Sequence, residues 1–270
     1  FPVTIRLLDP PLHEFLPNDL DGQKEMARRL KTTPGAVKAK VSALHEMNPM
    51  LGHRGCRLSI TYPEICRMQV TAIIEAACNV AKKKVKAIPE IMIPLIADVK
   101  ELTVMREMTV RIATAVEKKY KVKIPYDVGT MIEIARAALL AHTVAPEADF
   151  YSFGTNDLTQ TLYGLSRDDA GRFLPYYVEQ GIFDVDPFMS IDKEGVGLLM
   201  KMAIDSSRKI KKNMKMGICG EQVDPESVEF CYEVGLTYVS GSPFRLPVAR
   251  LAAAQATLKK KGKKKYGSVA

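Results

Sequence analysis

Short apolar or β-branched runs alternate along this chain with longer segments of helical pattern, and this alternation constrains the fold more than any other feature. It is typical of a parallel sheet whose strands are joined by helical crossovers. The predicted strands are residues 3–8, 91–96, 128–134, 150–158, 215–219 and 238–240, with 57–61 as a shorter candidate. The predicted helices are residues 23–31, 34–46, 63–80, 98–120, 136–142, 195–209, 225–234 and 247–258. Because parallel strands must be covered by helices, an α/β fold is expected.

Local signals mark the ends of several predicted elements. Asp98 is followed three residues later by Glu101, which predicts a capping box at the start of a helix that runs to about Tyr120. Pro63 is tolerated in a first helical turn and predicts the start of a long amphipathic helix. Residues 166–187 are polar and aromatic over a stretch too long for a simple connection, so we expect a functional or lid-like loop there.

Length and composition suit a globular chain. It has 270 residues, 47% of them hydrophobic, which allows one large domain or two small ones. No repeat or internal linker divides the sequence, so residues 1–258 are predicted to form one domain. The apolar runs are too short or too interrupted for a membrane span, and the chain does not begin with a secretory signal. Because the first residue is Phe1 rather than Met, we expect that the sequence begins inside a longer polypeptide.

The cysteines and histidines match no metal or disulfide pattern. Five cysteines, an odd number, are widely spaced without a Cys-x-x-Cys, which argues against a zinc knuckle or a disulfide framework. The four histidines form no His-Glu-x-x-His or similar ligand pattern. A reducing compartment is expected, and we predict a cytoplasmic location, with plastid and glycosome as alternatives.

The positive charge is concentrated at the end of the chain. The formal net charge is +8, and the run Lys259–Lys265 contains six lysines, so the remainder carries 8 − 6 = +2. Runs of this kind are usually solvated, disordered tails. We therefore predict that residues 259–270 form a basic tail and that nucleic acid is not a specific partner. Weak contact with RNA or anionic lipid stays an alternative.

Two acidic residues follow neighbouring apolar runs and are the strongest candidates for chemistry. Glu133 comes at the end of the run 128–134, and Asp157 at the end of the run 150–158. Such a convergent pair suits Mg²⁺, which prefers oxygen ligands and often keeps only one or two protein carboxylates. The remaining ligands could come from a phosphorylated oxyacid. The plain alternative is a pair of acids in an exposed loop.

Polar residues also gather where the other predicted strands end. In parallel barrels the sites lie at the carboxyl ends of the strands. The candidates that lie at or just beyond strand ends are Arg6, Asp9, Glu133, Asn156, Asp157 and Glu221. On sequence alone, an arginine in such a position is more often a salt-bridge partner than a ligand contact.

Six segments together resemble the C-terminal domain of the pyruvate, phosphate dikinase family of phosphoenolpyruvate-utilising enzymes. They are Arg6-Leu-Leu-Asp-Pro-Pro-Leu-His-Glu-Phe-Leu-Pro17, Asn48-Pro-Met-Leu-Gly-His-Arg-Gly-Cys-Arg57, Gly129-Thr-Met-Ile-Glu133, Ser152-Phe-Gly-Thr-Asn-Asp-Leu-Thr-Gln160, Gly217-Ile-Cys-Gly-Glu221 and Ser242-Pro-Phe-Arg245. The resemblance runs from Val3 to about Leu258. Phosphoenolpyruvate synthase and the phosphotransferase-system enzyme I share the Gly-Thr-Asn-Asp and Cys-Gly-Glu segments. The Leu-Leu-Asp-Pro-Pro-Leu-His-Glu-Phe segment is distinctive of the dikinase.

The resemblance implies a (β/α)₈ TIM barrel that binds phosphoenolpyruvate and pyruvate on Mg²⁺. Such a domain moves a phosphoryl group between pyruvate and a phosphohistidine on a separate domain, while ATP is bound by another domain of a complete enzyme that is expected to be a homodimer. Two strands that the family has before Val3 do not appear here. The expected fold is therefore an α/β barrel that lacks its first two strands in this chain and folds poorly or associates when alone.

The resemblance also implies roles for individual residues. Glu133 and Asp157 are the implied Mg²⁺ ligands. Arg6 is the implied phosphoryl-binding arginine, since a planar guanidinium matches phosphate oxygens, and Asp9 would orient it.

Further residues have weaker or less specific implied roles. The implied contacts to substrate carboxylate and phosphate come from Gly154, Thr155 and Asn156. For Arg54 and Arg57, a phosphate contact and a structural ion pair stay open as alternatives.

Two departures from the family concern the chemistry. Gly241 stands where the resemblance places a cysteine that acts as general acid, and Cys219, which lies within its own motif, was not assumed to replace it. The segment Gln222-Val-Asp-Pro225 is one residue shorter than its family counterpart. The alternatives are therefore a catalytically impaired phosphoenolpyruvate-binding fragment and, from another class, a nucleic-acid-binding or interaction protein that uses the lysine tail.

Overall fold

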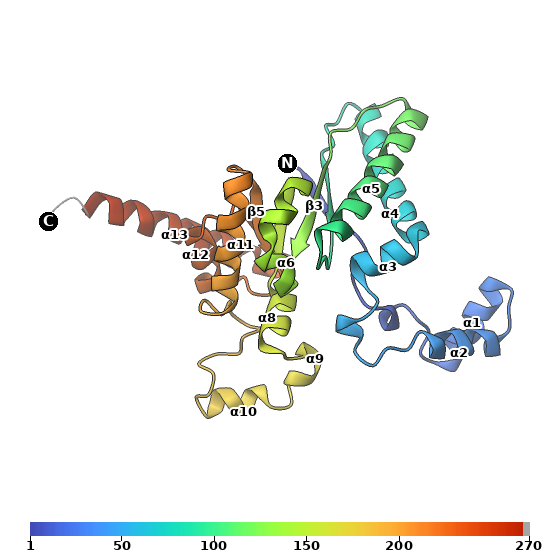
Figure 1. Ribbon diagram of the computed structural model, residues 1–270, viewed down its shortest axis with the longest axis horizontal. Helices are drawn as coiled ribbons and strands as arrows, with labels where there is room; N and C mark the ends of the chain where they lie inside the picture. The colour runs from blue at the N-terminus through green and yellow to red at the C-terminus, as the bar shows by residue number, and fades with distance from the viewer. Residues whose placement is uncertain (267–270) are drawn as a thin grey trace.

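The computed structural model describes residues 1–266 and contains a six-stranded parallel sheet with its strands in chain order (Figure 1). The strands are β1 (Val3–Arg6), β2 (Pro89–Ile93), β3 (Asp127–Ile132), β4 (Phe150–Gly154), β5 (Lys215–Cys219) and β6 (Tyr238–Ser240). Lys215 on β5 contacts Glu90 on β2 at 2.6 Å, although two strands separate them. The sheet must therefore be strongly curled. The predicted α/β class with parallel strands is confirmed.

Helices cover the convex face of this curled sheet and extend beyond its ends. The longer ones are α1 (Leu20–Leu30), α2 (Pro34–Ala43), α4 (Pro63–Lys82), α5 (Val99–Tyr120), α8 (Thr155–Tyr163), α11 (Val196–Ile210), α12 (Pro225–Glu233) and α13 (Leu246–Tyr266). The shorter ones are α3 (Gly55–Thr61), α6 (Ala135–Leu139), α7 (Ala141–Val144), α9 (Arg167–Ala170) and α10 (Leu174–Glu179). Short 3₁₀ turns are η1 (Leu12–Glu14), η2 (Pro49–Leu51), η3 (Ala145–Glu147) and η4 (Pro243–Arg245).

The two faces of the sheet differ because successive strand side chains alternate. On the convex face, residues such as Ile91, Ile132 and Phe153 join the main core with the covering helices. On the concave face only a small cluster forms, made by Met92, Met131 and Phe150. The concave face therefore keeps open space above this apolar floor.

The segment 57–61, a candidate strand from its sequence, forms the helix α3 instead. A short apolar run cannot be told from a buried helix by periodicity alone. Here Cys56 and Leu58 are buried, and the hydroxyl of Thr61 donates to the carbonyl of Arg57 one helical turn earlier. The strand prediction was wrong because α3 buries this run against α4 and α5.

The predicted strand 150–158 is also shorter than expected. β4 ends at Gly154, and α8 starts at Thr155. Asp157 therefore lies in the first turn of α8, where a carboxylate is favoured by the helix dipole. The predicted capping box is confirmed, since the Asp98 side chain accepts from the amide of Lys100 and Glu101 accepts from that of Asp98.

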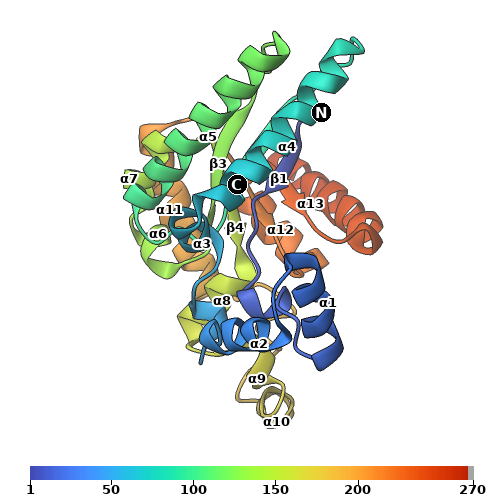
Figure 2. The same cartoon turned by 90° about the vertical axis from the view of Figure 1, so that its right-hand side faces the viewer.

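Two helical arms lie at the carboxyl ends of the strands, as Figures 1 and 2 show. One arm contains α1 and α2. The other contains α9 and α10 and is made of most of the segment 166–187, which was predicted to be a loop. Its rings pack edge to face, with Tyr177 at 5.2 Å from Phe173 and 5.4 Å from Phe183. This segment is a small packed unit, and its role as a lid stays a prediction.

The end of the chain is only partly described. α13 continues to Tyr266, whereas residues 267–270 of the predicted basic tail lie outside the described residues. The predicted disorder of residues 259–270 thus stays a prediction. None of the helices within residues 1–266 has the length and apolar character needed to cross a membrane.

Candidate active site

A cavity of about 540 Å³ opens on the concave side of the sheet, toward the carboxyl ends of the strands. Its walls include seven of the candidate residues, namely Arg6, Glu133, Gly154, Asn156, Asp157, Glu221 and Gly241. Asp9 and Thr155 are buried, and Asp9 reaches the cavity wall through its contact with Arg6. The structure therefore gathers the residues that the sequence singled out.

Glu133 follows directly after β3 and is fully buried. Its Oε1 accepts a 2.6 Å hydrogen bond from the amide of Leu95, which the left-handed backbone of Leu95 (φ 62°) helps to direct. Its Oε2 is buried without a hydrogen-bond partner. A Cβ at position 154 would collide with this oxygen, so only glycine fits there. Burial, followed by the negative charges of Asp157 and Asp9, raises the pKa of Glu133.

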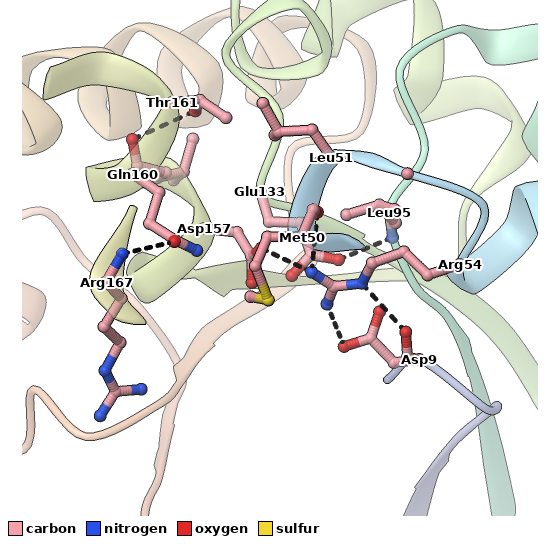
Figure 3. Close-up of polar contacts among 12 residues, drawn as sticks. Asp9, Met50, Leu51, Arg54, Leu95, Glu133, Asp157, Gln160, Thr161 and Arg167 are labelled. Carbon is pink, nitrogen blue, oxygen red and sulfur yellow. Dashed lines mark hydrogen bonds and ion pairs between the residues drawn. The ribbon is translucent and has the colours of Figure 1, made fainter. Parts of the chain in front are cut away.

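Asp157 approaches the same space from the first turn of α8 (Figure 3). Its Oδ1 accepts a hydrogen bond of 3.2 Å from Nη1 of Arg54, and its side chain is 17% exposed. Burial raises the pKa of Asp157, while the positive charge of Arg54 opposes that shift. Two neighbouring carboxylates thus share one poorly solvated site.

The residues present fit a Mg²⁺ ion. The buried Oε2 of Glu133 and Oδ1 of Asn156 lack partners, and both belong to residues that line the cavity. Within residues 1–266 no group of three or more His, Cys, Asp or Glu side chains is arranged to hold a metal. A site with two carboxylates would need oxygens from a ligand and water to complete the shell, which is usual for Mg²⁺.

Arginines and carboxylates alternate along one side of the cavity. Oδ2 of Asp9 lies 3.1 Å from Nη1 of Arg6 and 2.8 Å from Nη2 of Arg54. The side chain of Arg6 is 43% exposed and lines the cavity, so it can contact an anion there. Arg54 is buried and contacts Asp9 and Asp157, as Figure 3 shows. It is not among the residues that line the cavity. Arg57 donates to the carbonyls of Leu51 and Gly52. Arg54 is thus held in ion pairs, whereas the bonds of Arg57 go to backbone carbonyls rather than to an acid.

The start of α8 presents polar groups to the cavity. The first amides of a helix have no intrahelical partner and carry partial positive charge, which favours anions at this end. Thr155 Oγ1 is buried without a hydrogen-bond partner. Gly154 and Asn156, on either side of Thr155, line the cavity. This end of α8 can therefore contact a carboxylate or phosphate.

Cys219 is a further cavity residue that was not among the site residues predicted from the sequence. It ends β5, lines the same cavity and is half-buried. Burial raises the pKa of its thiol to about 11, so the thiol is protonated at neutral pH and can donate a proton. The Cys-Gly-Glu segment 219–221 could have pointed to this cysteine, but the family resemblance implies the general-acid role for position 241.

Gly241 lies on the cavity wall, and the general-acid position that the resemblance implies there stays a prediction. A Cβ at this position would lie 2.6 Å from Cγ2 of Val223. Val223 is 1% exposed, packs with Val228 and Ala252 and is not among the cavity residues. A side chain at position 241 would thus point at Val223. The shortened segment 222–225 and the glycine at 241 belong to one packing arrangement.

Over residues 1–258 the chain matches the family described as PEP-utilising enzyme, PEP-binding domain, where PEP stands for phosphoenolpyruvate. A pyruvate, phosphate dikinase from Giardia intestinalis is 54% identical, over 95% of this chain and 29% of the relative. One from Clostridium symbiosum is 54% identical, over 96% of this chain and 30% of the relative. A chloroplastic one from Arabidopsis thaliana is 53% identical, over 94% of this chain and 27% of the relative. The chain thus spans less than a third of these relatives.

Proposed function

Because the chain belongs to the PEP-binding domain family of phosphoenolpyruvate-utilising enzymes, we propose that its cavity binds phosphoenolpyruvate and pyruvate as the C-terminal part of a pyruvate, phosphate dikinase. One observation carries this proposal. Glu133 and Asp157 line the same cavity as Arg6, and Glu133 keeps a buried oxygen without a partner. The names of the relatives support the choice of substrate.

The proposal gives a separate role to each group of residues around the cavity. The guanidinium of Arg6 binds the phosphoryl group, and Asp9 holds Arg6 in place at 3.1 Å. The start of α8, with Gly154, Thr155 and Asn156, contacts the substrate carboxylate and phosphate. Glu133 and Asp157 would hold Mg²⁺, which supplies charge neutralisation at the enolate and phosphoryl oxygens when bound.

Cys219 is proposed as the proton donor of the reaction. Loss of the phosphoryl group from phosphoenolpyruvate leaves the enolate of pyruvate, which needs a proton at its methylene carbon. The S–H bond of Cys219 breaks, a C–H bond forms at that carbon, and a thiolate remains. A thiol whose pKa is raised to about 11 holds its proton until the strongly basic enolate carbon accepts it. General acid catalysis of this kind contributes about 10²–10⁴-fold.

The remaining features belong to the longer protein that such a reaction requires. The phosphoryl group is accepted by a phosphohistidine domain outside this chain, ATP is bound by another domain, and the complete enzyme is a cytoplasmic homodimer. The open strands β1 and β6 are the edges at which two further strands would pair to complete a (β/α)₈ barrel. The alternative is a catalytically impaired binding fragment, which would follow if the glycine at position 241 removes the general acid and Cys219 does not replace it.

Calorimetric titration of phosphoenolpyruvate into the protein tests the proposal. We expect binding in the presence of Mg²⁺ and at least about tenfold weaker binding in EDTA, because a dication offsets the repulsion between substrate and carboxylates. Titration with a single-stranded RNA under the same conditions should produce no saturable heat. Absence of phosphoenolpyruvate binding, or identical affinity with and without Mg²⁺, would contradict the proposal.

A further inference from the structure

Arg54 is a buried arginine that lies behind the cavity wall. It is 3% exposed and makes four hydrogen bonds. Its Nε donates to the carbonyl of Asp9 at 3.0 Å and its Nη2 to Oδ2 of Asp9 at 2.8 Å. Its Nη1 donates to the carbonyl of Met50 at 3.1 Å and to Oδ1 of Asp157 at 3.2 Å. One guanidinium thus joins the segment after β1 to the start of α8.

The backbone around Arg54 leaves this guanidinium little freedom. Arg54 immediately precedes α3, and its amide donates to the carbonyl of Gly52 at 3.1 Å. The next residue, Gly55, has a φ of 57°, and a Cβ there would lie 2.7 Å from Cβ of Leu95. Leu95 in turn donates its amide to Glu133. Arg54 is therefore anchored next to the backbone that orients the second carboxylate.

The two carboxylate oxygens of Asp157 differ in their contacts. Arg54 binds Oδ1, which leaves Oδ2 for the cavity that Asp157 lines. Asp9 binds Arg54 and Arg6 through the same oxygen. The positions of Arg6 and Asp157 are thus linked through a row of alternating charges, which are Arg6, Asp9, Arg54 and Asp157.

We propose that Arg54 is a positioning residue that directs one oxygen of Asp157 into the cavity and couples its orientation to that of Arg6. This inference rests on the proposed function, since it assigns Asp157 to a divalent ion and Arg6 to a phosphoryl group. A planar guanidinium suits the task because its fixed fork of donors reaches two acids at once. The ammonium of a lysine is a point charge and cannot hold both.

The test compares Arg54→Met and Arg54→Lys in the complete natural chain that contains this sequence. Mn²⁺ replaces Mg²⁺ as the probe, and electron paramagnetic resonance measures its affinity with and without phosphoenolpyruvate. Loss of a group that orients a metal ligand typically weakens metal binding about 10–100-fold, and we expect that loss for Arg54→Met. Arg54→Lys should fall between this variant and the wild type. Arg57→Met is the matched control, with less than about twofold change, because the Arg57 guanidinium donates to carbonyls of the neighbouring loop and Arg57 is not among the residues that line the cavity.

A second variant separates positioning from folding. Arg54→Met leaves Asp9 and Asp157 without their shared partner, which destabilises the fold. Arg54→Met/Asp9→Asn removes one of these uncompensated charges, so Tm should recover toward the wild-type value while Mn²⁺ binding stays weak. Recovery of Mn²⁺ binding together with Tm would overturn the inference, as would unchanged Mn²⁺ affinity in Arg54→Met. A wild-type protein that binds neither Mn²⁺ nor phosphoenolpyruvate would overturn the proposed function itself.

Discussion

A glutamate is buried at each end of the sheet, and the two glutamates differ in their hydrogen-bond partners. Near the amino ends of the strands, Glu90 is 2% exposed and accepts from the hydroxyl of Thr4 at 2.6 Å and from Nζ of Lys215 at 2.6 and 2.8 Å. At the carboxyl ends, Glu133 has one oxygen bound to an amide and the other without a partner. The first glutamate is satisfied within the chain, and the second is not.

This difference agrees with a structural role for Glu90 and with the proposed ligand-binding role of Glu133. Glu90, Lys215 and Thr4 join three strands across the concave face and close its amino end, where the aromatic rings of Phe150 and Tyr238 also lie near Nζ of Lys215. A buried carboxylate oxygen without a partner is costly, and this supports the proposal that a ligand binds at the other end. In parallel barrels the amino end serves stability and the carboxyl end serves catalysis.

The largest effect is expected from neutralising the carboxylates of the cavity. Glu133→Gln and Asp157→Asn each remove a charge that, in the proposed function, would hold the divalent ion. Phosphoryl transfer in the complete enzyme should fall by about 10³-fold or more, which corresponds to the several kcal/mol that a metal ion supplies. Steady-state assays measure this loss. Glu90→Gln is the control at the other end and should change Tm but not the Mg²⁺ dependence. Equal losses of activity at both ends would contradict the comparison.

The next largest effect concerns proton transfer at the same end. Cys219→Ala should slow exchange of the pyruvate methyl protons with deuterated solvent by about 10²-fold or more, and binding of phosphoenolpyruvate should persist. Proton magnetic resonance measures the exchange. Because the pKa of Cys219 is raised to about 11, alkylation of this thiol by iodoacetamide should be slow at pH 7 and accelerate up to about pH 11. Unchanged exchange in Cys219→Ala would remove the cysteine from the mechanism.

A smaller effect, on stability alone, is expected at the amino end. Lys215→Met leaves Glu90 buried, with the hydroxyl of Thr4 as the remaining donor to its carboxylate within the described residues. The free energy of unfolding should fall by about 2–3 kcal/mol, less than for a fully buried pair because the lysine side chain is partly exposed. At roughly 2–4 °C per kcal/mol for a chain of this size, calorimetry should show a clear drop in Tm. A weakened affinity for phosphoenolpyruvate would show that this end also serves binding.

The smallest effect tests the packing behind the cavity wall. Gly241→Cys alone should lower the free energy of unfolding by about 1–2 kcal/mol, because the new side chain meets Val223. Adding Val223→Gly makes room, so the double variant should lose less stability than the two single changes would sum to. Thermal melts of the four proteins measure this coupling. Gly171→Ala is the control, since a Cβ there has no heavy atom within 4 Å. Additive effects would mean that residues 223 and 241 pack independently.

Local patterns predicted the sheet and the acids because both depend on neighbours in sequence. Glu133 follows its strand directly, so a strand prediction also placed the carboxylate. The sequence predicted Asp157 at a strand end, whereas it lies in the first turn of α8. It nevertheless lines the cavity. The run 57–61 was misjudged because its burial depends on α4 and α5, which a five-residue pattern cannot reveal.

Contacts between distant segments were beyond the reach of sequence patterns. Arg54 meets Asp9 and Asp157, which are 45 and 103 residues away along the chain, so its choice between ligand contact and ion pair stayed open. The direction of a side chain at position 241 depends on Val223 in another loop. For the same reason, sequence motifs alone could not compare position 241 with Cys219 as the place of the proton donor. That comparison needs the geometry of the cavity.

The most direct measurement is a crystal structure of the complete protein with Mn²⁺ and phosphoenolpyruvate, in which anomalous scattering locates the metal. The account predicts a single peak at coordination distance, about 2.0–2.3 Å, from Oε2 of Glu133 and from an oxygen of Asp157, with substrate oxygens in the same shell. A peak elsewhere, or an ordered substrate with no metal between these two carboxylates, would contradict it.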